Sequence, residues 1–153
     1  MISQAPRLRI VFDTNVLLSL WVFADSRYAP LRGLMETGSL IALCNQDCLA
    51  EFERVLNYPE FELTIESQRV MLSEYGDLVS MIAKPAPKLE FPLPRCRDED
   101  DQKFLELARD GAADYLLTGD KALLALARHK KLPAHIAILT PDAFLCRSGF
   151  SPT

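Results

Sequence analysis

Two aspartates of this 153-residue chain follow short apolar segments, at the places where strands would end. Asp13 comes directly after residues 9–12, and Asp120 comes shortly after the segment 114–117. The carboxyl ends of parallel strands meet at one edge of a sheet, where α/β proteins bind their ligands. The two carboxylates are therefore candidates for one catalytic or metal site, although each could instead cap the helix that follows it.

A run of four consecutive acids, Asp98-Glu99-Asp100-Asp101, is a third candidate. Acids are common in the first turn of a helix, and Asp98 could be the cap of one. Capping uses only one or two carboxylates, however, and like charges at this spacing repel each other by roughly 0.2–0.5 kcal/mol per pair. A divalent cation would offset that repulsion, so the run predicts that Asp98 or Asp101 is a metal ligand.

A fourth acid is expected from the helix predicted after Asn45. The apolar stripe of this helix is centred between Cys48 and Leu56. Glu51 and Glu53 lie on the two opposite margins of the stripe. Helical geometry alone therefore leaves both glutamates open as candidates.

Carboxylates without histidine or cysteine partners form the kind of site that hard divalent cations such as Mg²⁺ or Mn²⁺ prefer. Such a metal can generate a nucleophile from water for attack on a phosphodiester and can stabilise the leaving oxygen. Without metal, the gathered carboxylates repel one another and their pKa values rise. We therefore expect the metal-free chain to be less stable than the metal-bound chain.

Short apolar strands alternate along the chain with longer helical segments. Strands are predicted at residues 9–12, 39–44, 114–117 and 136–139. Helices are predicted at residues 16–23, 28–36, 45–57, 65–83, 98–110 and 121–130, with a last helical turn from Thr140. This alternation is typical of a three-layer α/β/α sandwich around a central, mainly parallel sheet.

Four prolines within residues 84–94 predict an extended crossing segment. This segment is short enough to be a loop inside one domain. We therefore expect a single domain over residues 1–153, with its core at about residues 8–145.

The composition excludes several classes of protein. The 17 Lys and Arg residues are outnumbered by 21 Asp and Glu, and the resulting net charge of −4 argues against nucleic-acid binding over the whole surface. Four cysteines without a C-x-x-C pair, and only two histidines, exclude a zinc finger and a disulfide scaffold. The longest apolar stretch, residues 16–23, is too short to span a membrane, and no secretory signal precedes the first strand. We expect a cytoplasmic protein with no membrane contact.

Four segments of the chain resemble the motifs of PIN domains. They are FDTNVL at residues 12–17, LAEFERVL at 49–56, RDEDDQKF at 97–104 and ADYLLTGD at 113–120. The closest resemblance is to the branch described as toxin components of bacterial toxin–antitoxin systems. It extends from about Leu8 to Leu145 and includes the closing segment TPDAFL at residues 140–145.

The resemblance implies a metal-dependent endoribonuclease that cleaves RNA with Mg²⁺ or Mn²⁺ as cofactor. The residues that match the family's catalytic acids and metal ligands are Asp13, Glu51, Asp101 and Asp120, with Asp98 as a further metal ligand. Asn15 and Thr118 match the polar residues that orient these acids, and the resemblance favours Glu51 over Glu53. It also implies a small antitoxin protein as a partner and a homo-oligomer, a dimer.

Basic side chains must meet the RNA backbone. Arg95, Arg97 and Lys103 lie beside the acidic run in the sequence and are candidates for contacts with phosphates. A denser basic cluster at residues 128–131 is better explained as favourable charge at the C-terminus of a helix.

Two alternatives stay open from the residues, and a third does not fit. A haloacid-dehalogenase-like phosphatase also has an Asp after its first strand, but its D-x-D pattern would need an acid where this chain has Asn15. A non-catalytic PIN-like interaction module would be separated from a nuclease by metal-dependent cleavage of RNA by the pure protein. A receiver domain would need an acidic pair before its phosphorylated Asp and a late Lys after a strand, and neither arrangement is found.

Overall fold

A parallel sheet of five strands forms the centre of the computed structural model, which describes residues 7–85 and 92–148. The strands are β1 (Leu8–Phe12), β2 (Leu40–Cys44), β3 (Val79–Met81), β4 (Tyr115–Leu117) and β5 (Ala137–Leu139). Their order in the sheet is β3-β2-β1-β4-β5, and every neighbouring pair is parallel. Since β1 and β4 are neighbours, with Phe12 paired to Leu117, the segments that follow them leave the same edge side by side.

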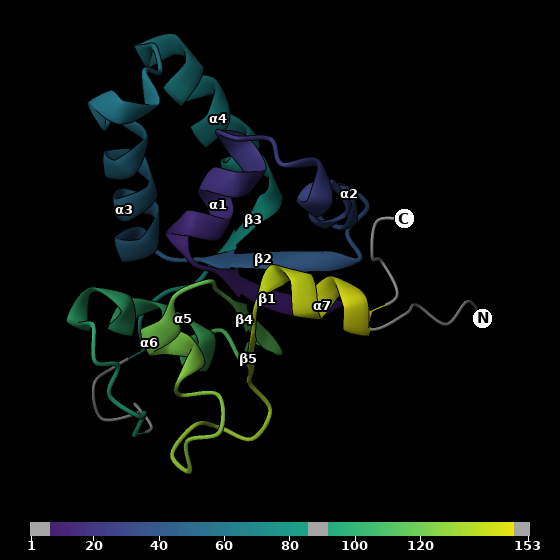
Figure 1. Cartoon of the computed structure of the whole chain (residues 1–153), viewed down its shortest axis with the longest axis vertical. Coiled ribbons are helices and arrows are strands. Elements are labelled where there is room, and N and C mark those ends of the chain that lie inside the picture. Colours follow the sequence, from purple (N-terminus) through teal and green to yellow (C-terminus); the bar gives the residue numbers. More distant parts are fainter. Residues whose placement is uncertain (1–6, 86–91, 149–153) are drawn as a thin grey trace.

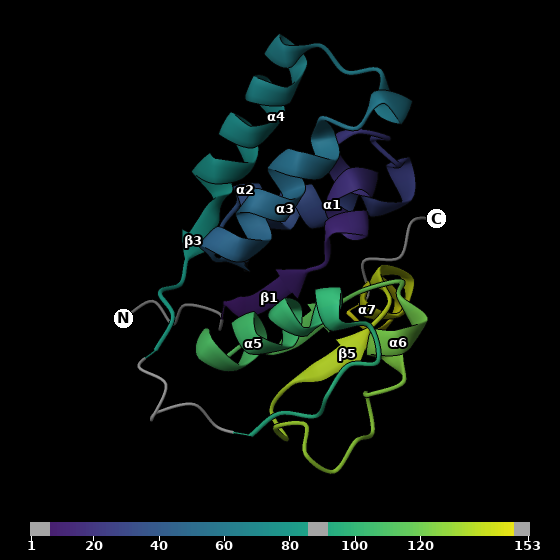
Figure 2. The same ribbon diagram turned by 90° about the vertical axis from the view of Figure 1, so that its left-hand side faces the viewer.

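Helices cover both faces of this sheet. They are α1 (Thr14–Trp21), α2 (Ala29–Glu36), α3 (Gln46–Leu56), α4 (Ile65–Leu78), α5 (Gln102–Asp110), α6 (Lys121–Leu124) and α7 (Pro141–Arg147). Figure 1 and Figure 2 show α1 to α4 on one side of the sheet and α5 and α6 on the other. The predicted three-layer α/β/α sandwich is thus confirmed. No helix within the two described ranges has both the length and the apolar character that a membrane span requires.

The core explains why the strands consist mostly of apolar residues, with Arg9 in β1 and Ser80 in β3 as exceptions. Ile10 and Val11 of β1 are fully buried, as is Leu116 of β4. A parallel sheet that carries helices on both faces has no solvated side, so successive residues are apolar rather than alternating.

Polar residues at the carboxyl edge of the sheet begin the helices. The Oδ1 atoms of Asp13 and Asn45 accept hydrogen bonds of 2.9 Å from the amides of Val16 and Cys48. These caps satisfy amides that have no partner within the helix, and they place α1 and α3 with their N-termini at this edge.

The fifth strand, β3, was not predicted from the sequence. The helical spacing of apolar residues predicted a helix to residue 83, but α4 ends at Leu78 and the chain pairs with β2, Ala42 opposite Val79. A mainly apolar run such as Leu78–Ile82 fits both helical and strand spacing. Its pairing with the free edge of β2 therefore determines that it forms a strand. Of the predicted extended segment 84–94, residues 84–85 and 92–94 contain neither helix nor strand, and the rest lies outside the described residues.

The last third of the chain contains two further differences. The acidic run forms a 3₁₀ turn, η4 (Glu99–Asp101), before α5, and α6 ends at Leu124 rather than at residue 130. After Leu124 the chain continues in turns, where Leu126 N donates to Leu123 O (3.0 Å). The basic cluster 128–131 therefore follows these turns and does not lie at the C-terminus of a long helix.

Gly111 follows directly after α5, which ends at Asp110 as predicted. A glycine at this place commonly adopts a left-handed conformation, but its φ is −93°, and it is Ala112 that has the positive φ of 51°. A Cβ atom at Gly111 would lie 2.8 Å from Leu43 Cδ1. The glycine is thus explained by the close approach of α5 to β2.

Candidate metal centre

A cleft of about 410 Å³ opens at the carboxyl edge of the sheet, beyond the ends of β1 and β4. Its walls come from the first turn of α1, one face of α3 and the segment that precedes α5. The five acids predicted as site residues all line it: Asp13, Glu51, Asp98, Asp101 and Asp120. The fold therefore brings together carboxylates that are up to 107 residues apart in the sequence.

Asp13 lies at the floor of the cleft and is buried. One of its oxygens caps α1, and the other accepts a hydrogen bond from Thr118 Oγ1. The same hydroxyl oxygen accepts a hydrogen bond of 2.9 Å from the amide of Asp120, so Thr118 joins the two strand-end aspartates. Burial raises the pKa of Asp13, and the charges of Asp120 and Glu51 raise it further, against the lowering effect of its hydrogen bonds.

Asp98, Asp101 and Asp120 form the tightest group of acids. Each offers one carboxylate oxygen, and these oxygens all lie within 4.8 Å of one another. Asp98 caps η4 through Oδ1, 3.0 Å from the amide of Asp100, and Asp120 caps α6 through Oδ1, 2.7 Å from the amide of Ala122. Capping thus occupies one oxygen of each of these two aspartates and leaves the other for a ligand.

Asp101 carries the clearest sign that a cation fits here. Its Oδ2 atom is buried and has no hydrogen-bond partner among the described residues. Burial raises the pKa of Asp101 to about 7, and the neighbouring charges of Asp120 and Asp98 contribute to the rise. A buried oxygen without a partner is costly, and a carboxylate set without histidine suits Mg²⁺ or Mn²⁺. The residues present therefore fit a divalent cation.

The raised pKa of Asp101 predicts a stability that falls with pH when metal is removed. The folded chain holds its proton up to about pH 7, whereas the unfolded chain releases it near pH 3.8. Because the folded state binds more protons in this window, the free energy of unfolding decreases as the pH rises through it. Denaturant unfolding in EDTA should show this decrease in the parent chain and a smaller one in Asp101→Asn. If the free energy of unfolding changed with pH in the same way in both proteins, the raised pKa of Asp101 would be contradicted.

Glu51 faces the cleft, whereas Glu53 is exposed on the other side of α3. The Glu51 side chain is 13% exposed. Its Oε2 accepts a hydrogen bond from Thr14 Oγ1, and its Oε1 lies 2.5 Å from Lys103 Nζ. Helical geometry left open whether Glu51 or Glu53 faces the site, and the structure places Glu51 there, as the family resemblance favoured. The role of Glu51 as a metal ligand stays a prediction.

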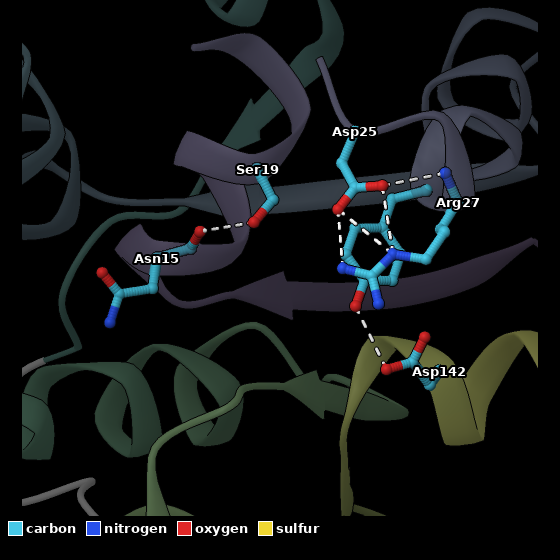
Figure 3. Close-up of polar contacts among 6 residues, drawn as sticks. Asn15, Ser19, Asp25, Arg27 and Asp142 are labelled. Carbon is cyan, nitrogen blue, oxygen red and sulfur yellow. Dashed lines mark hydrogen bonds and ion pairs between the residues drawn. The ribbon is translucent and has the colours of Figure 1, made fainter. Parts of the chain in front are cut away.

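The two polar residues predicted to orient the acids differ in what they contact. Thr118 is buried and bonded to Asp13, as described above. Asn15 lines the cleft, but its side chain makes no hydrogen bond in the described part of the chain, and its main-chain carbonyl accepts a hydrogen bond from Ser19 Oγ (3.2 Å). Figure 3 shows this contact beside the Asp25–Arg27 ion pair. In that neighbouring group, Tyr28 Oη donates to Asp142 Oδ2 (3.1 Å) and ties the loop after α1 to α7.

The three predicted phosphate contacts line one cavity but differ in their partners. Arg95 and Arg97 are exposed and line a second cavity of about 540 Å³ beside the acidic turn. Lys103 also borders that cavity, but its ammonium is paired with Glu51. Lys103 therefore differs from the two arginines because its charge is already paired with a carboxylate.

Sequence reasoning missed the outer wall of the acidic cleft. Arg54, Tyr58 and Phe61 line it, and Tyr58 is 39% exposed. Arg54 follows Glu51 by three residues on α3, which is the spacing of one helical face, whereas Tyr58 lies beyond the end of α3. Once Glu51 is placed in the cleft, that spacing could have identified Arg54 but not Tyr58.

Comparison with known proteins relates this geometry to one family. The sequence model described as PIN domain matches residues 9–122, a range that contains the five acids of the cleft. Over 143 residues the chain is 24% identical to the uncharacterized protein MJ1680 of Methanocaldococcus jannaschii. The alignment covers 91% of this chain and 90% of that protein.

Proposed function

Since this chain belongs to the PIN domain family, we propose that it is a metal-dependent endoribonuclease that cleaves RNA phosphodiesters in the acidic cleft. The observation that carries the proposal is the group of Asp98, Asp101 and Asp120, whose oxygens lie within 4.8 Å of one another. The buried, unpartnered Oδ2 of Asp101 adds the need for a cation at that point.

We propose that Asp98, Asp101 and Asp120, together with Asp13, hold Mg²⁺ or Mn²⁺, and that Glu51, whose oxygens contact Thr14 and Lys103, acts beside the ion rather than as one of its ligands. Such an ion, when bound, supplies an activated water and stabilises the oxygen that leaves the phosphate. The chain's own residues prepare the site: Thr118 fixes Asp13 and Asp120 relative to each other. Glu51, oriented by Thr14 and Lys103, can accept a hydrogen bond from a water in the cleft.

The substrate side of the proposal rests on the outer wall of the cleft. Tyr58 offers an exposed aromatic face on which an unpaired base can stack. Arg54, on the same wall, can neutralise a phosphate of the RNA backbone. Arg95 and Arg97 extend the same basic character beside the acidic turn. A chain with a net charge of −4 would bind RNA at such local cationic groups rather than over its whole surface.

Thermal unfolding with added metal tests the proposed cofactor. A ligand that binds only the folded state stabilises it by about 2.7 kcal/mol at a concentration about 100 times its Kd. We expect Mn²⁺ and Mg²⁺ to raise the melting temperature of the parent chain, and Asp101→Asn to remove most of that increase. Glu99→Gln is the matched control, because Glu99 belongs to the same acidic run but not to the group of three. Equal increases in the two variants, or no increase in the parent, would count against the site.

The cellular role is a further part of the proposal. The similarity of the motifs to the toxin branch supports a toxin that a small antitoxin protein inhibits, acting as a cytoplasmic homodimer with one PIN domain over residues 1–153. A short reading frame immediately upstream of the gene, and a stable complex of its product with this chain, would support that role. Membership in the PIN family argues against the phosphatase alternative.

A further inference from the structure

Lys103 lines the cavity beside the acidic cleft, and its ammonium pairs with one acid of that cleft, Glu51. Its Nζ is 2.5 Å from Glu51 Oε1, and it donates a hydrogen bond of 2.6 Å to the carbonyl oxygen of Asp100. The ammonium also lies 5.4 Å from the centre of the Phe104 ring. This one side chain therefore connects α3, the acidic turn η4 and α5.

The contact completes the surroundings of Glu51. Thr14 Oγ1 donates to one carboxylate oxygen, and Lys103 binds the other, from which the exposed Arg54 guanidinium lies 3.8 Å away. Glu51 is thereby fixed between the start of α1 and the start of α5. Among the described residues, the close group of acids consists of Asp98, Asp101 and Asp120, and does not include Glu51.

The ion pair of Lys103 and Glu51 is more buried than the second ion pair between a lysine and α3, which joins Lys84 to Asp47. The side chains of Lys103 and Glu51 are 20% and 13% exposed, whereas those of Lys84 and Asp47 are 58% and 49% exposed. Exposed ion pairs contribute little and hold no fixed geometry. A shielded pair with a further hydrogen bond to a carbonyl restricts both side chains.

We propose that Lys103 is a positioning residue, which orients Glu51 toward the cleft and ties the acidic turn to α3. This inference rests on the proposed nuclease function. It differs from the role expected from sequence, in which Lys103 contacts a phosphate of the RNA.

Lys103 helps to orient Glu51, but its positive charge should weaken the binding of a metal ion. An ammonium close to the acids reduces their attraction for a divalent cation. Its removal should therefore tighten metal binding and, at the same time, slow the reaction because Glu51 loses its orientation. A residue that only stabilised the fold would not produce this combination.

The experiment compares Lys103→Met, Lys103→Arg and the control Lys84→Met with the parent chain. For Lys103→Met we expect kcat to fall at least about tenfold at saturating Mn²⁺, with KM for RNA unchanged within about twofold. Titration of the RNA-free protein with Mn²⁺ should show binding at least about threefold tighter than in the parent. Lys103→Arg, which keeps the charge, should recover part of kcat, and Lys84→Met should behave as the parent in both measurements.

Other outcomes overturn the inference in distinguishable ways. A raised KM with unchanged kcat would show a phosphate contact instead, and unchanged values throughout would show an ordinary surface pair. Weaker Mn²⁺ binding by Lys103→Met would contradict the charge argument. If Lys103→Met does not fold, a Lys103→Arg variant that folds but shows only background kcat still contradicts the expected rescue.

A parent chain that does not cleave RNA overturns the proposed function and this role with it, whereas an active parent leaves only the role of Lys103 in question.

Discussion

Replacement of Asp13 by Asn is expected to lower RNA cleavage at least about a hundredfold, which corresponds to about 2.7 kcal/mol of transition-state stabilisation. The substitution keeps the size of the side chain but removes the negative charge at the floor of the cleft. Burial raises the pKa of Asp13, and the neighbouring charges of Asp120 and Glu51 raise it further. A metal held by these acids would lose one of its anionic neighbours.

The same substitution should leave the fold intact. An Asn oxygen can still accept the 2.9 Å hydrogen bond from the Val16 amide, and its amide group can donate to Thr118. Because burial penalises the carboxylate at neutral pH, the free energy of unfolding in EDTA should be equal to or greater than that of the parent. Cleavage assays and denaturant unfolding of both proteins check the two statements. A variant that cuts RNA as fast as the parent would reduce Asp13 to a helix cap.

Glu51→Gln should lower metal-dependent turnover at least about tenfold, a loss of about 1.4 kcal/mol in transition-state stabilisation. Glutamine keeps the length of the side chain, but it loses the charge that binds Lys103 and one of the two acceptor oxygens. Because Lys103 and Thr14 already bind both oxygens of Glu51, we expect the loss to remain at saturating Mn²⁺.

Glu53→Gln is the matched control, two residues away on the same helix and exposed. It should change turnover little and the free energy of unfolding by no more than about 0.5 kcal/mol. Both variants are compared at saturating and at limiting Mn²⁺, where the loss of a direct ligand would be more severe. Equal effects of the two substitutions, or a larger effect of Glu53→Gln, would contradict the placement of Glu51 in the cleft.

The sequence was sufficient for those parts of the fold that depend on local signals. Helices were predicted directly after Asn45 and Thr64, and these two residues cap α3 and α4 there. The strands around Ile10, Leu43 and Leu116 are apolar apart from Arg9 near the start of β1, because helices cover both faces of the sheet. The alternation of these strands with helices was enough to predict a parallel sheet.

Long-range contacts account for what the sequence could not supply. β3 is a strand because the edge of β2 was free to pair with it, and Gly111 is required by its closeness to Leu43. The ion pair of Lys103 and Glu51 joins residues 52 positions apart, and the type of neither residue indicates which partner it will contact. For the same reason the sequence could propose Lys103 as a phosphate contact but could not reveal the carboxylate beside it.

Cleavage of a circular single-stranded RNA by the purified chain tests the central claim most directly, because a circle offers no ends to an exonuclease. With Mn²⁺ or Mg²⁺ we expect the parent chain to open the circle and then to shorten the linear product. EDTA and the Asp13→Asn variant, purified in the same way, should leave the circle intact. A circle that stays closed with the parent chain and metal, or opens equally well in EDTA or with Asp13→Asn, would contradict a metal-dependent endoribonuclease at this cleft.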